Sequence, residues 1–297
     1  YSREYQKHNF PLNGLTLEFR NFGNVKVLRR AISIHQYQSF NLFQTKNNLC
    51  LNFQLGGGLG YLTKFYHKDG NPTNNAIGSH VNAKVSFKLE LNKYFDKIHL
   101  GLGTELSHFS NGAMQLPNLG LNNFSGYVNV GYNLSPRQVF EPNSEFVMTM
   151  EISRTYFLIE GIFSVAEVPP IPLDPKKYPV FAGRFSFVKP ISKAWNYELA
   201  VDGVYNVSNQ YRYYDSTHTA KDVPQVGLYA GMSMNYYKSQ IVFGMGYYLM
   251  DKINPLGRIY NRVGYRYFFN EKWCGLFNIR ANFGRADFFE FGLGYKL

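Results

Sequence analysis

The sequence predicts an all-β protein, a transmembrane antiparallel up-and-down β-barrel of about fourteen strands. Aromatic residues are abundant, with 24 Tyr and 26 Phe among 297 residues, while only 17% of the residues are charged. A soluble core seldom needs so many aromatic side chains with so little charge. The chain has no run of about 18 apolar residues to form a transmembrane helix. Apolar and polar residues alternate from end to end, and a closed barrel also satisfies every backbone group in lipid.

Two segments illustrate the alternation. In residues 81–91, every second side chain is apolar and the side chains between them are mostly charged or amide. In residues 258–269, the polar face carries Arg258, Arg262 and Arg266. Three arginines facing a soluble apolar core would be costly, whereas a polar barrel lumen accommodates them.

Fourteen segments have the length and the period of membrane strands, although merging weak ones would leave twelve. They are residues 12–21, 27–41, 48–62, 78–91, 97–110, 122–134, 145–159, 179–189, 195–208, 224–236, 239–250, 258–269, 273–284 and 288–297. Short connections at 237–240 and 269–272 indicate periplasmic turns, and longer ones at 63–79, 164–179 and 212–224 indicate external loops. We therefore expect a single outer-membrane barrel domain over residues 1–297.

Charge and the first residues suggest where the chain resides. No basic and apolar leader precedes Tyr1, so we expect a mature chain of the bacterial outer membrane whose signal peptide has been removed. The net charge of +11 comes without a compact Lys/Arg run, which favours an anionic lipid surface over nucleic acid as the partner. Cys50 and Cys274 are expected to be unpaired. A soluble β-sandwich or lipocalin-like barrel would leave the outward aromatic side chains without a partner.

The hairpin at residues 105–124 places polar side chains on a face that should be apolar. In the strand from Lys97, the even positions are apolar as far as Leu106, so His108 and Ser110 continue the lipid face. In the returning strand, Asn122 has the same outward parity. Three polar side chains at the outer rim of one hairpin therefore share a lipid-facing surface.

Such a group suits nucleophilic catalysis. A serine nucleophile needs a base within hydrogen-bond reach, and the base needs a third group to fix its tautomer. Ser110, His108 and Asn122 could fill these roles, while Asn111, Gly112 and Asn118 could donate N–H groups to an oxyanion. A His-x-Ser on a strand is by itself weak evidence, because polar rim residues are common in barrels.

The stretch "HFSNGAMQLPNLG" resembles the signature of outer-membrane lipid A 3-O-deacylases of the PagL type, a His-x-Ser-Asn followed by a Pro-Asn-x-Gly loop. The resemblance covers about fifteen residues closely and residues 1–135 loosely, which leaves 136–297 as additional barrel strands. It implies a serine esterase that removes an ester-linked acyl chain from lipid A of the outer leaflet, without metal or other cofactor. It also implies that Ser110 is the nucleophile, that His108 is the base, and that Asn111, Gly112 and Asn118 shape the oxyanion site.

Two departures from the family pattern bear on activity. Asn122 stands where the family has a glutamate, and an amide stabilises an imidazolium less than a carboxylate does. The family barrel is also about half as long as this chain. Glu105 cannot obviously replace the missing carboxylate, because its parity is lumenal.

Other polar residues are candidate ligands. Lys64 and Lys68, in the loop at 63–79, could contact lipid A phosphates, or they could be ordinary solvated loop residues. His80, His99 and Glu105 could meet inside the barrel, although no metal-binding spacing supports a metal site. The rival function is a non-enzymatic channel or transporter for a hydrophobic solute, which predicts an open lumen. The enzyme predicts a plugged lumen and a shallow apolar groove beside His108.

Overall fold

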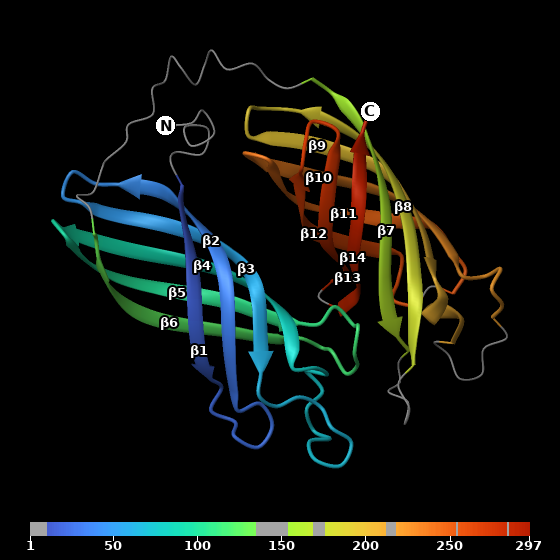
Figure 1. Cartoon of the computed structure of the whole chain (residues 1–297), viewed down its shortest axis with the longest axis horizontal. Helices are drawn as coiled ribbons and strands as arrows, with labels where there is room; N and C mark the ends of the chain where they lie inside the picture. The colour runs from blue at the N-terminus through green and yellow to red at the C-terminus, as the bar shows by residue number, and fades with distance from the viewer. Residues whose placement is uncertain (1–10, 135–153, 169–175, 212–217, 254, 284) are drawn as a thin grey trace. The chain divides into compact units, whose positions relative to one another are not determined.

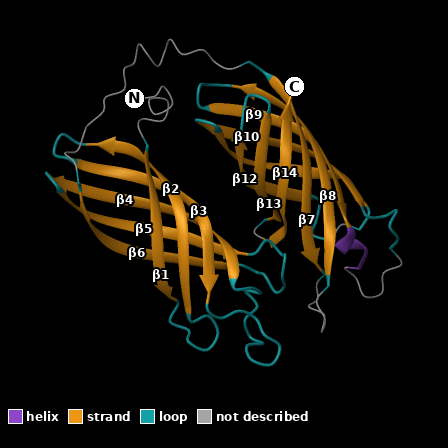
Figure 2. Cartoon of the chain, in the orientation of Figure 1, coloured by secondary structure: helices purple, strands orange, loops and turns teal. Residues whose placement is uncertain are grey.

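The structure, a computed structural model, describes residues 11–134, 154–168, 176–211, 218–253, 255–283 and 285–297. These residues form fourteen antiparallel strands and one short 3-10 helix, Val207–Tyr211 (Figure 2). No helix among them is long and apolar enough to cross a membrane. The chain divides into two compact units, Tyr1–Asn111 with Gly120–Thr149 and Gly112–Leu119 with Met150–Leu297.

The first unit is a six-stranded sheet in which each strand pairs with the next along the chain (Figure 1). Its strands are β1 (Leu12–Asn21), β2 (Arg30–Gln44), β3 (Leu49–Leu62), β4 (Val81–Phe95), β5 (Ile98–Ser110) and β6 (Leu121–Tyr132). Tight turns join the strands at one end. At one of them, Asp96 adopts a positive φ of 45°, as a two-residue hairpin turn requires. At the other end of the sheet are the long connections 22–29, 63–80 and 111–120.

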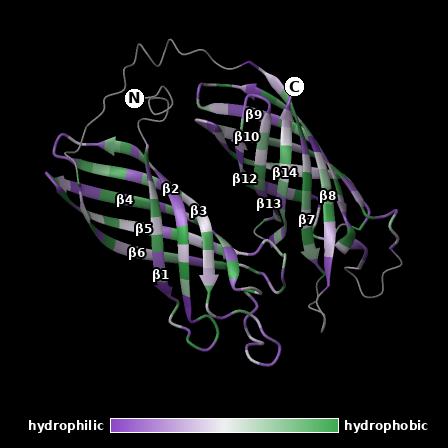
Figure 3. Cartoon of the chain, viewed as in Figure 1, coloured by the Kyte–Doolittle hydropathy of each residue, from purple (hydrophilic) through white to green (hydrophobic). Residues whose placement is uncertain are grey.

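The sheet separates polar from apolar side chains, and the strands show the alternating hydropathy in Figure 3. Apolar side chains point away from the concave face, and Val128 on β6 is 80% exposed. On the concave face, Arg20 of β1 donates to Glu105 (2.8 Å) and to Ser107 (2.9 Å) of β5. Lys84 of β4 is paired with Glu18 of β1. Because β1 reaches residues on β4 and β5, the sheet must be strongly curved.

The second unit contains a closed eight-stranded barrel with the strand order β10-β11-β12-β13-β14-β7-β8-β9. Its strands are β7 (Tyr156–Glu167), β8 (Lys177–Pro190), β9 (Trp195–Asn206), β10 (Pro224–Tyr236), β11 (Ser239–Asp251), β12 (Ile259–Phe268), β13 (Trp273–Asn282) and β14 (Arg285–Lys296). Each of these eight described strands pairs with a neighbour on both sides, so that closure leaves none of them at an edge, as a barrel in lipid requires.

A buried ion network fills the lumen of this barrel. Arg262 donates to Glu290 (2.7 Å) and to Asp202 (2.9 Å). Arg266 donates to Glu160 (2.7 Å) and to Glu198 (2.8 Å). Arg184 and Arg280 join the same network, so that four arginines face four carboxylates. The opposite charges of this network are balanced, and its members are at most 3% exposed.

The predicted fold class is confirmed, and the described residues contain fourteen strands. The strands form two separate sheets, however, because β14 pairs with β7 and leaves β6 paired only with β5 among the described residues. One continuous fourteen-stranded ladder is therefore not the observed pairing. A single domain over residues 1–297, with additional strands after residue 135, stays a prediction.

One strand is placed differently from the prediction. The seventh strand was expected at 145–159, followed by an external loop at 164–179, but β7 runs to Glu167 and β8 begins at Lys177. The pairing of Val165 with Pro179 extends the ladder into the expected loop. The first part of the expected strand lies outside the described residues.

Candidate active site

His108 and Asn122 face each other across the β5–β6 hairpin. They are direct register partners, and the Nδ1 atom of His108 lies 2.7 Å from the Oδ1 atom of Asn122. An amide oxygen only accepts hydrogen bonds, so Nδ1 carries the proton of this bond. The Nε2 atom of a neutral His108 ring is then left with its lone pair, as a general base requires.

Ser110 is the last residue of β5 and has the same parity as His108. It pairs in register with Ala83 of β4, and only 2% of its surface is exposed, whereas His108 is partly exposed. The expected outward parity of His108 is therefore seen, while Ser110 lies closer to the protein interior than a rim position implies.

Gly120 packs against the His108 ring and was not among the residues singled out from the sequence. A Cβ atom at this position would lie 2.5 Å from Cε1 and 3.2 Å from Nε2 of His108. The backbone of Gly120 has a φ of +78°, and its N–H donates to the Ala76 carbonyl (3.0 Å). Any side chain here would displace the imidazole or strain the backbone. The only signal in the sequence was the final glycine of "PNLG".

Asn111 forms a hydrogen bond within the first unit, and the loop residues after it have an unusual backbone conformation. Within the first unit, the Nδ2 atom of Asn111 donates to Ser79 Oγ (3.0 Å), which connects the end of β5 to the connection at 63–80. Gly112 and Ala113 both have positive φ, and Asn118 is 7% exposed. The oxyanion roles of Asn111, Gly112 and Asn118 stay predictions.

The segment Gly112–Leu119 belongs to the second unit, together with the barrel. The Leu116 N–H donates to Glu167 Oε2 (2.7 Å), and the Glu167 N–H donates to the Ala113 carbonyl (3.4 Å). A Cβ atom on Gly112 would collide with the Phe289 ring. Neither Glu167 nor Phe289 was singled out from the sequence, because nothing in their local sequence indicates a contact so distant along the chain.

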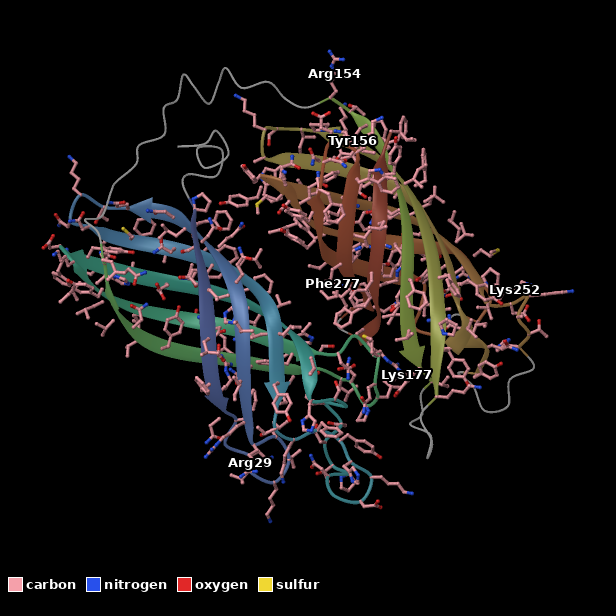
Figure 4. The ribbon with its side chains drawn as sticks, viewed as in Figure 1. Arg29, Arg154, Tyr156, Lys177, Lys252 and Phe277 are labelled. Carbon is pink, nitrogen blue, oxygen red and sulfur yellow. The ribbon has the colours of Figure 1, made fainter. Side chains whose placement is uncertain are left out.

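Lys64 and Lys68 lie at the long-connection end of the first unit, as Ser110 does. The Lys64 ammonium donates to the Lys26 carbonyl (2.9 Å), and Lys68 is exposed. Side-chain amides of Asn71 and Asn74 both donate to the Val27 carbonyl, which joins the connections 22–29 and 63–80. Three further cations occupy this end of the sheet, Lys26, Arg29 and Arg30, and Arg29 is labelled in Figure 4.

His80, His99 and Glu105 do not form a common site. His80 contacts the Leu62 carbonyl through Nδ1 (2.7 Å) and stacks on Tyr61. His99 packs near the other end of β5, against Tyr94, and Glu105 is bonded to Arg20. The described part of the chain contains no group of three or more His, Cys, Asp or Glu side chains that could hold a metal ion. Glu105 therefore does not supply the carboxylate that position 122 lacks.

Comparisons with known proteins match the two units separately. The family model described as lipid A 3-O-deacylase (PagL) matches residues 5–133, and the one described as acyloxyacyl hydrolase, C-terminal domain, matches residues 150–297. Among curated proteins, none matches the chain.

Several solved structures of membrane barrels show a distant likeness. A mutant of the porin of Rhodopseudomonas blastica is 8% identical, with 96% of this chain and 100% of that chain covered and a TM-score of 0.21. The Pseudomonas putida toluene transporter TodX is 10% identical, with coverages of 96% and 87% and a TM-score of 0.23. Scores this low carry no argument about fold or function.

Proposed function

Because this chain belongs to the PagL family of outer-membrane lipid A deacylases, which are carboxylic ester hydrolases, we propose that it cleaves its lipid A substrate with Ser110 as the nucleophile and His108 as the base. The observation that carries this assignment is the hydrogen bond between His108 and Asn122 (2.7 Å). It fixes the ring tautomer, beside a serine of the same strand and parity, within the half of the chain that matches the deacylase model.

The proposed reaction proceeds through an acyl-enzyme. His108 Nε2 takes the Ser110 proton as Oγ attacks the ester carbonyl, and N–H groups of Asn111, Gly112 and Asn118 stabilise the developing oxyanion. The tetrahedral intermediate then collapses with cleavage of the ester C–O bond, the imidazolium protonates the departing sugar oxygen, and the acyl group remains on Ser110. Water, activated by the same nitrogen, releases the fatty acid. Gly120 leaves room for the imidazole ring throughout this cycle.

The substrate is held, in this proposal, by the cations at the long-connection end of the first unit. Lys64 and Lys68 would bind lipid A phosphates, supported by Lys26, Arg29 and Arg30 on the adjoining connection. Lysine and arginine near a membrane surface attract anionic headgroups. The acyl chains would remain in the bilayer beside the outward apolar face of β5 and β6.

The alternative function, a channel or transporter, is disfavoured by one observation. The lumen of the closed barrel contains four arginines paired with four carboxylates, all buried. This agrees with the plugged lumen expected of an enzyme. The apolar groove beside His108 stays a prediction.

An active-site probe tests the assignment of Ser110. An alkyl fluorophosphonate forms a stable bond with an activated serine, and peptide mass spectrometry locates the adduct. We expect labelling at Ser110 in the wild type and in Ser125→Ala, a control on the inner face of β6, and none in Ser110→Ala or His108→Ala. Labelling that persists in folded His108→Ala would remove His108 from the proposed mechanism.

A further inference from the structure

The short-turn end of the closed barrel carries a ring of cations. The cations are Arg154, Lys189, Lys193, Lys238, Lys272 and Lys296. Each pair of strands that a short turn joins at this end contributes at least one of these cations, and so does the pair whose chain ends lie there. The β8–β9 turn supplies Lys189 and Lys193, the β10–β11 turn Lys238, the β12–β13 turn Lys272, and the ends of β14 and β7 Lys296 and Arg154.

These cations are not neutralised by the protein. Among the described residues of these turns and strand ends, Glu271 is the one acidic side chain outside the lumen. None of the six cations forms an ion pair within the described part of the chain. The opposite end also carries lysines, Lys176, Lys177, Lys221 and Lys252, but there Asp222 pairs with Lys252 (3.2 Å), and the buried carboxylates of Glu167, Asp251 and Asp287 lie at the same end. Figure 4 labels Arg154 at the first end and Lys177 and Lys252 at the other.

Aromatic side chains surround the barrel near the same end. Both tryptophans of the chain lie there, Trp195 at the start of β9 and Trp273 at the start of β13, and Trp273 is 46% exposed. Other outward aromatic residues at this end are Tyr197, Tyr237, Tyr267 and Phe269. Trp and Tyr concentrate at the boundary between hydrocarbon and headgroups. This belt therefore places the cations at the depth of the headgroups.

Two of the cations lie directly on rings of the barrel wall. The Lys272 ammonium lies 5.9 Å from the centre of the Tyr295 ring, and the Lys296 ammonium lies 4.3 Å from that of Tyr156. Tyr156 is buried and its hydroxyl accepts from Gln240, so Lys296 lies at the lumenal side of the barrel rim, whereas Lys272 lies beside the ring of Tyr295 at the end of β14. A cation held there by a neutral ring keeps its full charge for an outside anion.

We propose that the short-turn end of the barrel binds the headgroups of anionic phospholipids, through the six-cation ring defined above. Short turns are typical of the periplasmic side of an outer-membrane barrel, so the lipids belong to the periplasmic leaflet. The even distribution around a closed barrel suits a shell of single lipids better than one protein partner, which would contact one sector. This site is independent of the proposed ester hydrolysis.

Native mass spectrometry of the full chain tests the proposal, in neutral detergent titrated with phosphatidylglycerol or phosphatidylcholine. We expect preferential binding of phosphatidylglycerol that weakens as salt is raised. The triple variant Lys193→Gln, Lys238→Gln, Lys272→Gln should bind it at least about tenfold more weakly. The matched triple variant at the other end, Lys176→Gln, Lys177→Gln, Lys221→Gln, should bind like the wild type.

Three results would overturn the proposal. Equal affinity for the two lipids would assign binding to the aromatic belt alone. An equal loss in both triple variants would show a general effect of net charge. Displacement of the lipid by inorganic phosphate at modest concentration would indicate a site for a free anion. Heat-modifiable mobility in gels shows whether each variant is folded. If a triple variant is not folded, the single variant Lys238→Gln replaces it in the binding measurement.

Discussion

Asn122 is the residue that most distinguishes the site of this chain from the family pattern. Its amide oxygen fixes the tautomer of His108 as a carboxylate would, but it carries no charge to stabilise the imidazolium that forms in the proposed attack. Asn122 therefore orients the His108 ring without stabilising its positive charge. The site is expected to be assembled correctly and to react more slowly than one with glutamate.

Replacing Asn122 tests this separation. We expect Asn122→Glu to raise kcat about tenfold or more, because a carboxylate stabilises the protonated ring. Asn122→Ala should lower kcat, since the ring loses its partner. Release of fatty acid from lipid A measures both. If the two folded variants match the wild type, Asn122 is not the partner on which His108 depends.

Gly120 is the second residue with a specific requirement. Gly120→Ala places a Cβ atom 2.5 Å from the His108 ring and forces a side chain into a φ of +78°. We expect about a hundredfold loss of kcat, because a shift of the base by about 1 Å is costly to catalysis. Gly126→Ala on β6 is the matched control, since its nearest neighbour would be 4.0 Å away. Equal kinetics in the two variants would show that the ring position is not critical.

Among the elements, the connection Gly112–Leu119 is held by one buried carboxylate. Glu167 accepts the Leu116 N–H at 2.7 Å and is 3% exposed. We expect Glu167→Ala to increase amide exchange of this segment about tenfold, because a charged acceptor contributes roughly 1.5–3 kcal/mol. Glu167→Gln keeps an acceptor oxygen and should restore most of the protection. Unchanged exchange in Glu167→Ala would mean that other contacts hold the segment.

Sequence alternation predicted most of these elements well. The strand β10 begins and ends where it was expected, and most other ends agree within a few residues, because side-chain period directly reflects the inward and outward faces. The same alternation predicted that the side chains of His108 and Asn122 would lie next to each other on one face of the hairpin. Contacts between distant segments could not be predicted this way. The packing of Gly120 against the His108 ring depends on the conformation of a turn. The hydrogen bond between Glu167 and Leu116 depends on tertiary packing.

At the scale of the whole molecule, hydrogen bonding divides the fourteen strands into a curved sheet and a closed barrel. Alternation defines the two faces of each strand but not its partner, which is why one continuous ladder was expected. Of the three arginines predicted to face a lumen, Arg262 and Arg266 do so in the closed barrel, whereas Arg258 is exposed just before β12. Together with Arg184 and Arg280 they carry four positive charges, which are matched by Glu160, Glu198, Asp202 and Glu290.

This network should stabilise the barrel only as a complete set. Arg262→Met leaves Asp202 and Glu290 short of a partner in a buried site, so we expect a loss of about 3–5 kcal/mol in the free energy of unfolding. Urea unfolding in detergent measures it. Arg258→Met, at an exposed position before β12, is the control and should change stability little. Comparable stability of both variants would show that the lumen tolerates unpaired carboxylates.

In the proposed function, Ser110 performs ester hydrolysis on lipid A. Its most direct test is mass analysis of lipid A after incubation with the purified wild-type chain and with Ser110→Ala, both shown to be folded. The wild type should yield lipid A lighter by one ester-linked acyl chain together with the free fatty acid, and Ser110→Ala should yield neither. Unchanged lipid A with the folded wild type, or equal release by both chains, would contradict the claim.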